Sequence, residues 1–228
     1  MIDLHAHVLP GIDDGPATLA DSLALLGAMD DQGVTTVIAG AHTLDGKYNA
    51  TKEAVLAATE LVNAELRRAG RSIVVLPGME LYLGFDLLRA LRSGDVFGLN
   101  RSRHILVELP HREFPMYTER ALFEVMIAGF RPILNHPERN AEIRRRPELM
   151  YRLAEKGVYA MVTAASLLGR FGAECQALAE EFVAEGAAPY IVSDAHNLKG
   201  RAPLLAEGLV AARAFGKVDQ AAELSLLS

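Results

Sequence analysis

The chain has 228 residues, half of them hydrophobic, and a formal net charge of −6 at pH 7. This length suits one domain with a sizeable core, and the negative charge argues against nucleic acid or an anionic membrane as the main partner. Its single cysteine excludes an internal disulfide, and no leader or apolar run long enough to span a membrane is present. We therefore expect a cytoplasmic protein without direct membrane insertion, whose oligomeric state the sequence leaves open.

Short apolar strands alternate with helices along the chain. The first strand covers residues 2–4, and a loop rich in Gly, Pro and Asp follows it before Thr18 caps a helix that ends at Gly33. Further strands are predicted over residues 34–39, 73–76, 105–107, 132–134, 158–162 and 190–192. Further helices are predicted over residues 49–69, 85–92, 117–128, 147–156, 167–184 and 203–215.

This alternation predicts an α/β fold with parallel strands and right-handed crossovers. An open doubly wound sheet and a barrel both fit the pattern. An open sheet concentrates its polar residues at one switch point, whereas here polar residues follow almost every strand, as in a barrel. We therefore predict a distorted (β/α)7 TIM-like barrel over residues 1–228, with a metal site at the carboxyl ends of the strands.

The residues at the strand ends are of metal-binding types. His5 and His7 alternate with the period of a strand, so both imidazoles project to one face, and Asp194 and His196 repeat this spacing. The candidate metal ligands are His5, His7, Asp14, His42, Glu80, Glu108, His136, Asp194 and His196. So many imidazole and carboxylate groups exceed the capacity of one tetrahedral ion. Two or three ions with bridging carboxylates are therefore expected.

Simpler structural roles compete with this interpretation for single residues. A lone carboxylate at the end of a strand is more often a surface or capping group. Glu80 and Glu108, however, directly follow apolar strands, where an unpaired charge is costly. His136 has a structural role as its alternative. His104 opens its strand at the opposite end of the barrel and is interpreted as structural, whereas His111 lies at the correct end and can line the mouth.

Arg139 and Arg201 each follow candidate ligands closely in sequence. A planar guanidinium suits bidentate contact with phosphate, and the alternative is a solvated surface arginine. The basic run at residues 144–146 is interpreted as solvated. Cys175 lacks the arginine six residues later that cysteine-based phosphatases require, because Glu181 is found there, so a packed thiol is expected.

Several segments resemble the PHP (polymerase and histidinol phosphatase) family, and in particular its bacterial branch of manganese-dependent protein-tyrosine phosphatases. The matching segments are residues 2–7, 11–16, 78–80, 108–110, 136–139 and 193–201. The resemblance implies phosphomonoester hydrolysis with Mn²⁺, for which Fe, Zn, Mg or Co are the alternatives. It also implies a phosphotyrosine protein as substrate, namely the tail of a bacterial tyrosine kinase that controls polysaccharide synthesis or export.

The resemblance further implies a role for each site residue. The three ion sites would be His5, His7, Glu80 and Asp194; Glu80, Glu108 and His136; and Asp14, His42 and His196. Arg139 and Arg201 match the phosphate-binding arginines of the branch. Asp194 and His196 are both candidates to protonate the leaving group, and the sequence does not decide between them.

Other functions remain open from the sequence. A small-molecule phosphatase such as histidinol phosphatase would use the same metals but differ in the residues around the entrance to the metal site. An amidohydrolase typically bridges two ions with a modified lysine on the fourth strand, where this chain has Glu108. A metal-bound regulatory subunit without activity is the alternative outside enzymes. The loop at residues 41–48 departs from the pattern of the branch, which leaves its effect on substrate preference open.

Overall fold

A computed structural model describes residues 1–215 of the chain. Its strands are β1 (Ile2–Ala6), β2 (Thr36–Ala39), β3 (Ala41–Thr43), β4 (Val74–Leu76), β5 (Met79–Tyr82), β6 (His104–Glu108), β7 (Arg131–Asn135), β8 (Tyr159–Thr163) and β9 (Tyr190–Val192). Its α-helices are α1 (Leu19–Asp31), α2 (Lys52–Arg68), α3 (Leu87–Ser93), α4 (Thr118–Ile127), α5 (Ala141–Arg145), α6 (Glu148–Glu155), α7 (Ala164–Leu167), α8 (Ala173–Ala184) and α9 (Leu205–Ala212). Two short 3₁₀ helices are η1 (Leu99–Arg101) and η2 (Pro137–Arg139).

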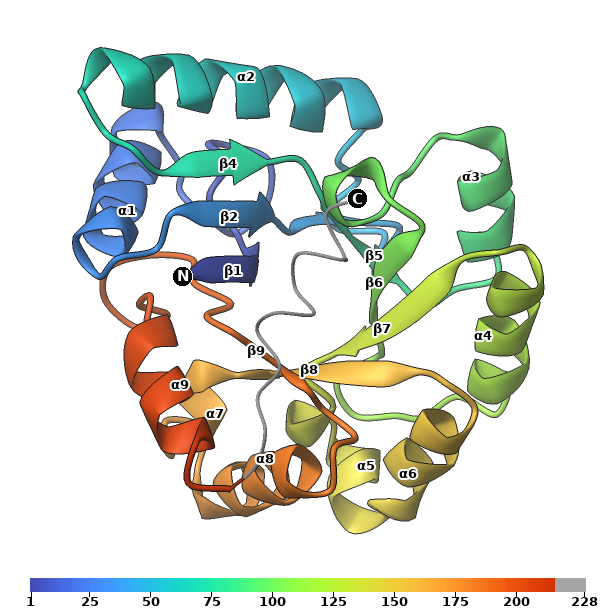
Figure 1. Ribbon diagram of the computed structural model, residues 1–228. Helices are drawn as coiled ribbons and strands as arrows, with labels where there is room; N and C mark the ends of the chain where they lie inside the picture. The colour runs from blue at the N-terminus through green and yellow to red at the C-terminus, as the bar shows by residue number, and fades with distance from the viewer. Residues whose placement is uncertain (216–228) are drawn as a thin grey trace.

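The strands lie at the centre and the helices surround them (Figure 1). All strand pairs are parallel, in the orders β1-β2-β4 and β3-β5-β6-β7-β8-β9. Within the described residues no ladder joins β9 to β1, so the barrel is not closed. Two backbone hydrogen bonds link these ends instead, from His7 N to Ala195 O (2.8 Å) and from Asp194 N to His5 O (3.0 Å). The predicted parallel α/β, TIM-like fold is thus confirmed, with a gap in its hydrogen bonding.

Two of the predicted strands are interrupted, which corrects the sequence analysis. Gly40 separates β2 from β3, and two residues, Pro77 and Gly78, separate β4 from β5. His42 and Glu80 therefore lie inside short strands that pair with each other, and not beyond the strand ends. The prediction was wrong because glycine and proline there were interpreted as the ends of the strands, whereas the same two segments resume pairing with each other after the break.

The helices also differ from their predicted bounds. The helix predicted over residues 167–184 is two helices, α7 and α8, because Gly169 and Gly172 between them adopt positive φ values of 71° and 93°. The last helix, predicted over 203–215, is limited to α9. Helix α5 was missed. It is short, and the Asn140 side chain caps it by accepting hydrogen bonds from Glu142 N and Ile143 N. By contrast, Thr18 caps α1 as predicted.

Two groups of apolar side chains form the core. The larger group packs the strands against the surrounding helices. The smaller group draws side chains from β1, β2, β6, β7, β8 and β9, as expected for the filled interior of a ring of strands; its members are Leu4, Ile38, Leu99, Leu106, Ile133, Met161, Tyr190 and Val192. Because this interior is filled, polar side chains gather at one end of the ring. Among the described helices, none combines the length and apolarity needed to cross a membrane.

Candidate metal centre

The deepest part of the site is formed by β1, β5 and the segment after β9. His5 Nε2 lies 3.5 Å from Glu80 Oε2 and 3.3 Å from Asp194 Oδ1. His7 Nε2 faces the same two oxygens at 3.3 and 3.6 Å. All four side chains are at most 3% exposed. The structure therefore brings together the four residues that the sequence analysis assigned to a first ion.

Glu80 also belongs to a second group of potential ligands. His42 Nδ1 lies 3.2 Å from Glu80 Oε2 and 3.6 Å from Glu108 Oε2. His136 Nε2 approaches Glu108 Oε1 at 3.5 Å and Glu80 Oε1 at 3.7 Å. Glu80 thus faces both groups through one carboxylate, which is the geometry that a bridging ligand requires.

A third group lies nearest to the solvent. Asp14 Oδ1 is 3.2 Å from His196 Nε2 and 3.5 Å from His42 Nε2. His7 is the fourth member of this group. The Asp14 side chain is 36% exposed, in contrast to the buried first group. All nine candidate ligands are therefore neighbours, and their roles as ligands stay predictions.

Hydrogen bonds fix two of the imidazoles in a ligand-like state. His7 Nδ1 lies 2.8 Å from Asp13 Oδ2, and His196 Nδ1 lies 2.9 Å from the Asp194 backbone oxygen. Because these oxygens can only accept, each Nδ1 carries a proton, which leaves Nε2 as the ring nitrogen available to a cation. A carboxylate or carbonyl behind a histidine is the usual support for metal ligation.

The buried atoms that face one another fit a cation. Among residues 1–215, His7 Nε2, Glu80 Oε2, Asp194 Oδ1 and His196 Nε2 have no hydrogen-bond partner. Such unsatisfied acceptors are costly in a protein interior. A metal ion satisfies all of them at once, because each can offer it a lone pair. Burial opposes protonation of His7, but the neighbouring Asp13 and Glu80 outweigh it and raise the His7 pKa, so His7 Nε2 offers its lone pair after losing that proton. The mixed nitrogen and oxygen donors suit a borderline divalent ion such as Mn²⁺, Fe²⁺ or Zn²⁺.

The electrostatics of the two glutamates differ. Burial, together with the charges of Glu80 and Asp194, raises the pKa of Glu108 to about 9. Burial also opposes ionisation of Glu80, but His5, His7 and His42 outweigh it and hold the Glu80 pKa well below its usual range. Without a cation, Glu108 therefore keeps a proton at neutral pH. A bound cation would replace that proton.

Both predicted arginines reach the buried carboxylate Asp194. Arg139 Nη1 and Arg201 Nη2 donate to Asp194 Oδ2 at 2.7 and 2.6 Å. Burial opposes ionisation of Asp194, but His5 and these two arginines hold its pKa well below its usual range. The Arg139 guanidinium also stacks on the Phe171 ring, 4.5 Å from the ring centroid. Two cations thus converge beside the candidate ligands, where an anion would lie.

Backbone geometry supports the same site. His136 and Asp194 adopt left-handed conformations, with φ values of 33° and 51°, which is unusual for residues with side chains and is concentrated at functional sites. Gly40 leaves room for a ligand: a Cβ atom there would lie 2.0 Å from His5 Nδ1. His5 can occupy its position only because residue 40 has no side chain.

The other histidines lie as the sequence analysis suggested. His104 opens β6, at the opposite end of that strand from Glu108. His111 lies at the mouth, with Nε2 3.8 Å from Glu108 Oε1 and its ring stacked 6.1 Å from that of His136. In the divergent loop, Tyr48 stacks on His42 with a ring separation of 5.8 Å. Aromatic rings therefore flank the mouth on two sides.

Sequence reasoning missed several supporting residues. Asp13 was overlooked beside Asp14, although it binds both His7 Nδ1 and the His42 backbone N–H. Asn135 donates to Glu80 Oε1 and lies 3.1 Å from His5 Nε2. Buried Glu138 accepts hydrogen bonds from Thr163 and Ser166. The sequence signal that could have pointed to these residues is that each is polar and lies within two residues of a predicted ligand. It was not sufficient, because most of the groups that they bind are far away in the sequence.

Comparison with known proteins identifies relatives along almost the entire chain. The model of the capsular polysaccharide synthesis family CpsB/CapC matches residues 1–225. The tyrosine-protein phosphatase YwqE of Bacillus subtilis is 37% identical over 201 residues, which are 88% of this chain and 79% of the relative.

Solved structures agree with this result. The structure described as that of YwqE from Bacillus subtilis and CpsB from Streptococcus pneumoniae, "unique metal-dependent tyrosine phosphatases", superposes with a TM-score of 0.94 at 36% identity, covering 100% of this chain and 94% of the other. An amidohydrolase from Mycoplasma synoviae matches with a TM-score of 0.56 at 11% identity, covering 100% of this chain and 85% of the other. The second likeness shows the TIM-like fold alone.

Proposed function

This chain belongs to the CpsB/CapC family of capsular polysaccharide synthesis proteins, and we propose that it is a metal-dependent protein-tyrosine phosphatase. The tyrosine phosphatases among its relatives support this activity. The wider relationship to the PHP family is proposed from the motifs of the sequence. It is consistent with the TIM-like fold.

The observation that carries this proposal is the position of two arginines beside a group of metal-type ligands. Arg139 and Arg201 meet at one oxygen of Asp194, whose other oxygen faces His5 and His7. Metal-ligand side chains alone would fit many hydrolases. Two guanidinium groups next to them favour a phosphoryl group, which has enough oxygens to contact cations and both arginines together.

We assign the site residues two roles in hydrolysis, metal binding and phosphate binding. The first ion would be held by His5, His7, Glu80 and Asp194, the second by Glu80, Glu108 and His136, and the third by Asp14, His42 and His196. When bound, such ions activate water and neutralise phosphoryl oxygens. Arg139 and Arg201 bind the phosphate and stabilise charge on its oxygens during transfer.

The leaving group needs modest assistance. A tyrosine hydroxyl has a pKa of about 10, so its oxygen leaves with less help from an acid than an alkyl alcohol requires. His196 and Asp194 are the candidates to deliver a proton to that oxygen. Asp194 Oδ2 is already bound by two arginines, which favours its charged form, and His196 Nε2 faces the third group of ligands while its Nδ1 is bonded to the Asp194 backbone oxygen. The geometry therefore favours neither residue over the other.

We further propose that two or three Mn²⁺ ions act in the cell and that the substrate is a phosphotyrosine protein, namely a bacterial tyrosine kinase tail that controls polysaccharide synthesis or export. The family's link to capsular polysaccharide synthesis supports this substrate. A cytoplasmic location remains a prediction from the sequence.

The test combines metal analysis with a choice of substrates. The purified chain is stripped of metal, reloaded with Mn²⁺, and supplied with a phosphotyrosine peptide or with histidinol phosphate. We expect two or three ions per chain by elemental analysis and hydrolysis of the peptide only after reloading. Preference for histidinol phosphate would overturn the assignment in favour of a small-molecule phosphatase. Metal binding without any hydrolysis would support a regulatory subunit.

A further inference from the structure

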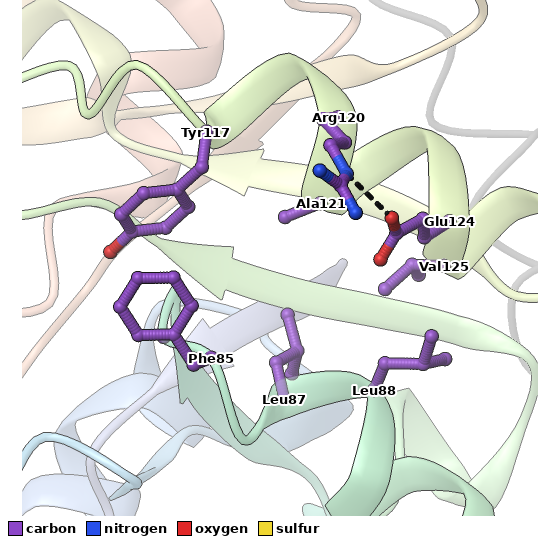
Figure 2. Close-up of a pocket in the computed structure, with 9 residues that line it drawn as sticks. Phe85, Leu87, Leu88, Tyr117, Arg120, Ala121, Glu124 and Val125 are labelled. Atoms are coloured by element: carbon purple, nitrogen blue, oxygen red, sulfur yellow. Dashed lines mark hydrogen bonds and ion pairs between the residues drawn. The ribbon is translucent and has the colours of Figure 1, made fainter.

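An apolar pocket lies between α3 and α4, away from the candidate ligands. Figure 2 shows Leu87 and Leu88 of α3 facing Ala121 and Val125 of α4 across it. An ion pair between Arg120 and Glu124, with Nε 2.8 Å from Oε1, borders the pocket. Its volume is about 200 Å³. This is below the range of roughly 300–1,000 Å³ for sites of drug-sized ligands, so the pocket suits one side chain.

Phe85, which lines this α3–α4 pocket, and Met116, which precedes the lining residue Tyr117 in the chain, are unusually exposed apolar side chains. Phe85 is 87% exposed and Met116 is 103% exposed, the two highest values among the large hydrophobic residues that the structure describes. The Phe85 ring lies 4.7 Å from that of Tyr117, which follows Met116 in the chain. Such grouped exposure is typical of a surface that another molecule covers.

A second cavity adjoins this pocket and extends to His111, which contacts the candidate ligand Glu108. It has a volume of about 600 Å³ and is lined by His111, Arg112, Tyr82 and Tyr117, among others. His111 approaches Glu108 at 3.8 Å, and Tyr117 lines both cavities. The Tyr117 hydroxyl donates to Leu83 O at 3.4 Å, which holds the ring between the two cavities. The second cavity therefore lies next to both the α3–α4 pocket, through Tyr117, and the candidate ligand Glu108, through His111.

We propose that the α3–α4 pocket binds an apolar side chain of a peptide substrate whose phosphotyrosine occupies the metal centre, with the intervening peptide in the cavity beside His111. This inference rests on the proposed function. The position of the second cavity, between the pocket and the His111 side chain that contacts Glu108 and His136, favours a substrate segment over other occupants.

The test compares peptides with a small substrate. Phosphotyrosine peptides with an alanine background carry a single leucine at each flanking position in turn, and phenyl phosphate serves as the substrate without flanks. For the Mn²⁺-loaded chain, we expect leucine at one position to raise kcat/KM by about fivefold or more, since burial of an apolar side chain is favourable. Binding of the matching phosphonate peptide, measured by fluorescence anisotropy, should tighten by a similar factor.

Two variants address the pocket in different ways. Ala121→Phe fills it, and Phe85→Asp places a charge at its exposed entrance without disturbing buried groups. Both should abolish the gain from leucine while leaving phenyl phosphate turnover unchanged. The control is Val210→Asp on α9, which is 68% exposed and lies on the other side of the ring (Figure 1). It should keep the gain.

The outcomes separate this inference from the proposed function. If the wild-type chain fails to hydrolyse both phenyl phosphate and all peptides, the proposed function is wrong. If phenyl phosphate is hydrolysed but leucine has no effect at any position, the pocket is not a substrate subsite. Self-association that disappears in Phe85→Asp, combined with an unchanged leucine effect, would also overturn the inference, because a second copy would then cover the pocket.

Discussion

The candidate metal centre has a buried base and a mouth that faces the solvent, and the two differ in how their charged groups are paired. At the base, His5, His7 and Glu80 are almost fully buried, and several of their lone pairs lack partners within the described residues. At the mouth, Asp14 and Arg201 are 36% and 27% exposed and already lie near each other, with Arg201 Nη1 3.5 Å from Asp14 Oδ2. The base therefore depends on a cation for its stability, whereas the mouth is compatible with water. We infer that the base controls metal retention and that the mouth controls the substrate.

Complete removal of metal should have the largest effect. We expect a strong chelator to abolish activity and to lower the melting temperature by about 10 °C, because cations present at 1,000 times their Kd stabilise a fold by about 4 kcal/mol, and 1 kcal/mol shifts Tm by about 2–4 °C at this size. Differential scanning fluorimetry with parallel elemental analysis measures this. An unchanged melting temperature after verified metal loss would contradict the dependence of the base on cations.

Glu80→Ala should have the second largest effect. We expect it to lower activity by about 1,000-fold or more, because the carboxylate faces two groups of ligands. Glu108→Ala removes a carboxylate that faces only one of them, so we expect a smaller loss of about 10–100-fold. Turnover of an aryl phosphate and bound metal per chain should be measured for both. Equal metal content and equal residual activity in the two variants would remove the case for Glu80 as a bridging ligand.

Arg139→Ala and Arg201→Ala should lower kcat/KM by about 100–1,000-fold, the range for loss of a preorganised donor. Metal content should remain normal, since guanidinium has no lone pair for a metal. Inorganic phosphate should also compete less well. Lysine at either position should restore activity only in part, because it keeps the charge without the planar pair of donors. Wild-type turnover in both alanine variants would show that neither arginine contacts the phosphate.

The smallest effect is expected at Phe171, which contacts no candidate ligand but stacks on Arg139. A cation–π contact at an exposed site is worth about 0.5–1 kcal/mol, so Phe171→Ala should weaken inhibition by inorganic phosphate roughly two- to fivefold. Phe171→Tyr keeps the ring and should retain wild-type inhibition. If alanine and tyrosine behave alike, the ring does not orient the guanidinium.

The sequence predicted the parts of this protein that depend on local pattern. The parallel α/β order follows from alternating apolar segments, and the grouping of His5, Glu108 and Asp194 follows from the common edge of parallel strands. The interruption of two strands at Gly40 and Gly78 was not predictable in the same way. The same two segments pair with each other on both sides of the interruption, at Ile38↔Leu76 and Ala41↔Met79, so it is a gap within one ladder that the apolar pattern does not mark.

The supporting residues were missed for a related reason. Asn135 touches His5, 130 residues earlier, and Glu138 binds Thr163, 25 residues later. No spacing rule connects such pairs, since only the folded arrangement of strands brings them together. Asp13 differs because it is close in sequence to His7. There the pair Asp13-Asp14 offered two equivalent carboxylates, and only the geometry shows that Asp13 supports histidines while Asp14 faces the third group.

The missing side chain at Gly40 has a consequence for how this protein tolerates mutation. Any other residue would place an atom where His5 Nδ1 lies, so even alanine, the most conservative substitution, would displace a candidate ligand. In a library of single substitutions selected for activity, position 40 should be as intolerant as the histidine itself. Searches for essential chemistry that consider only reactive side chains would overlook it, although empty space at this position is as necessary as the imidazole that fills it.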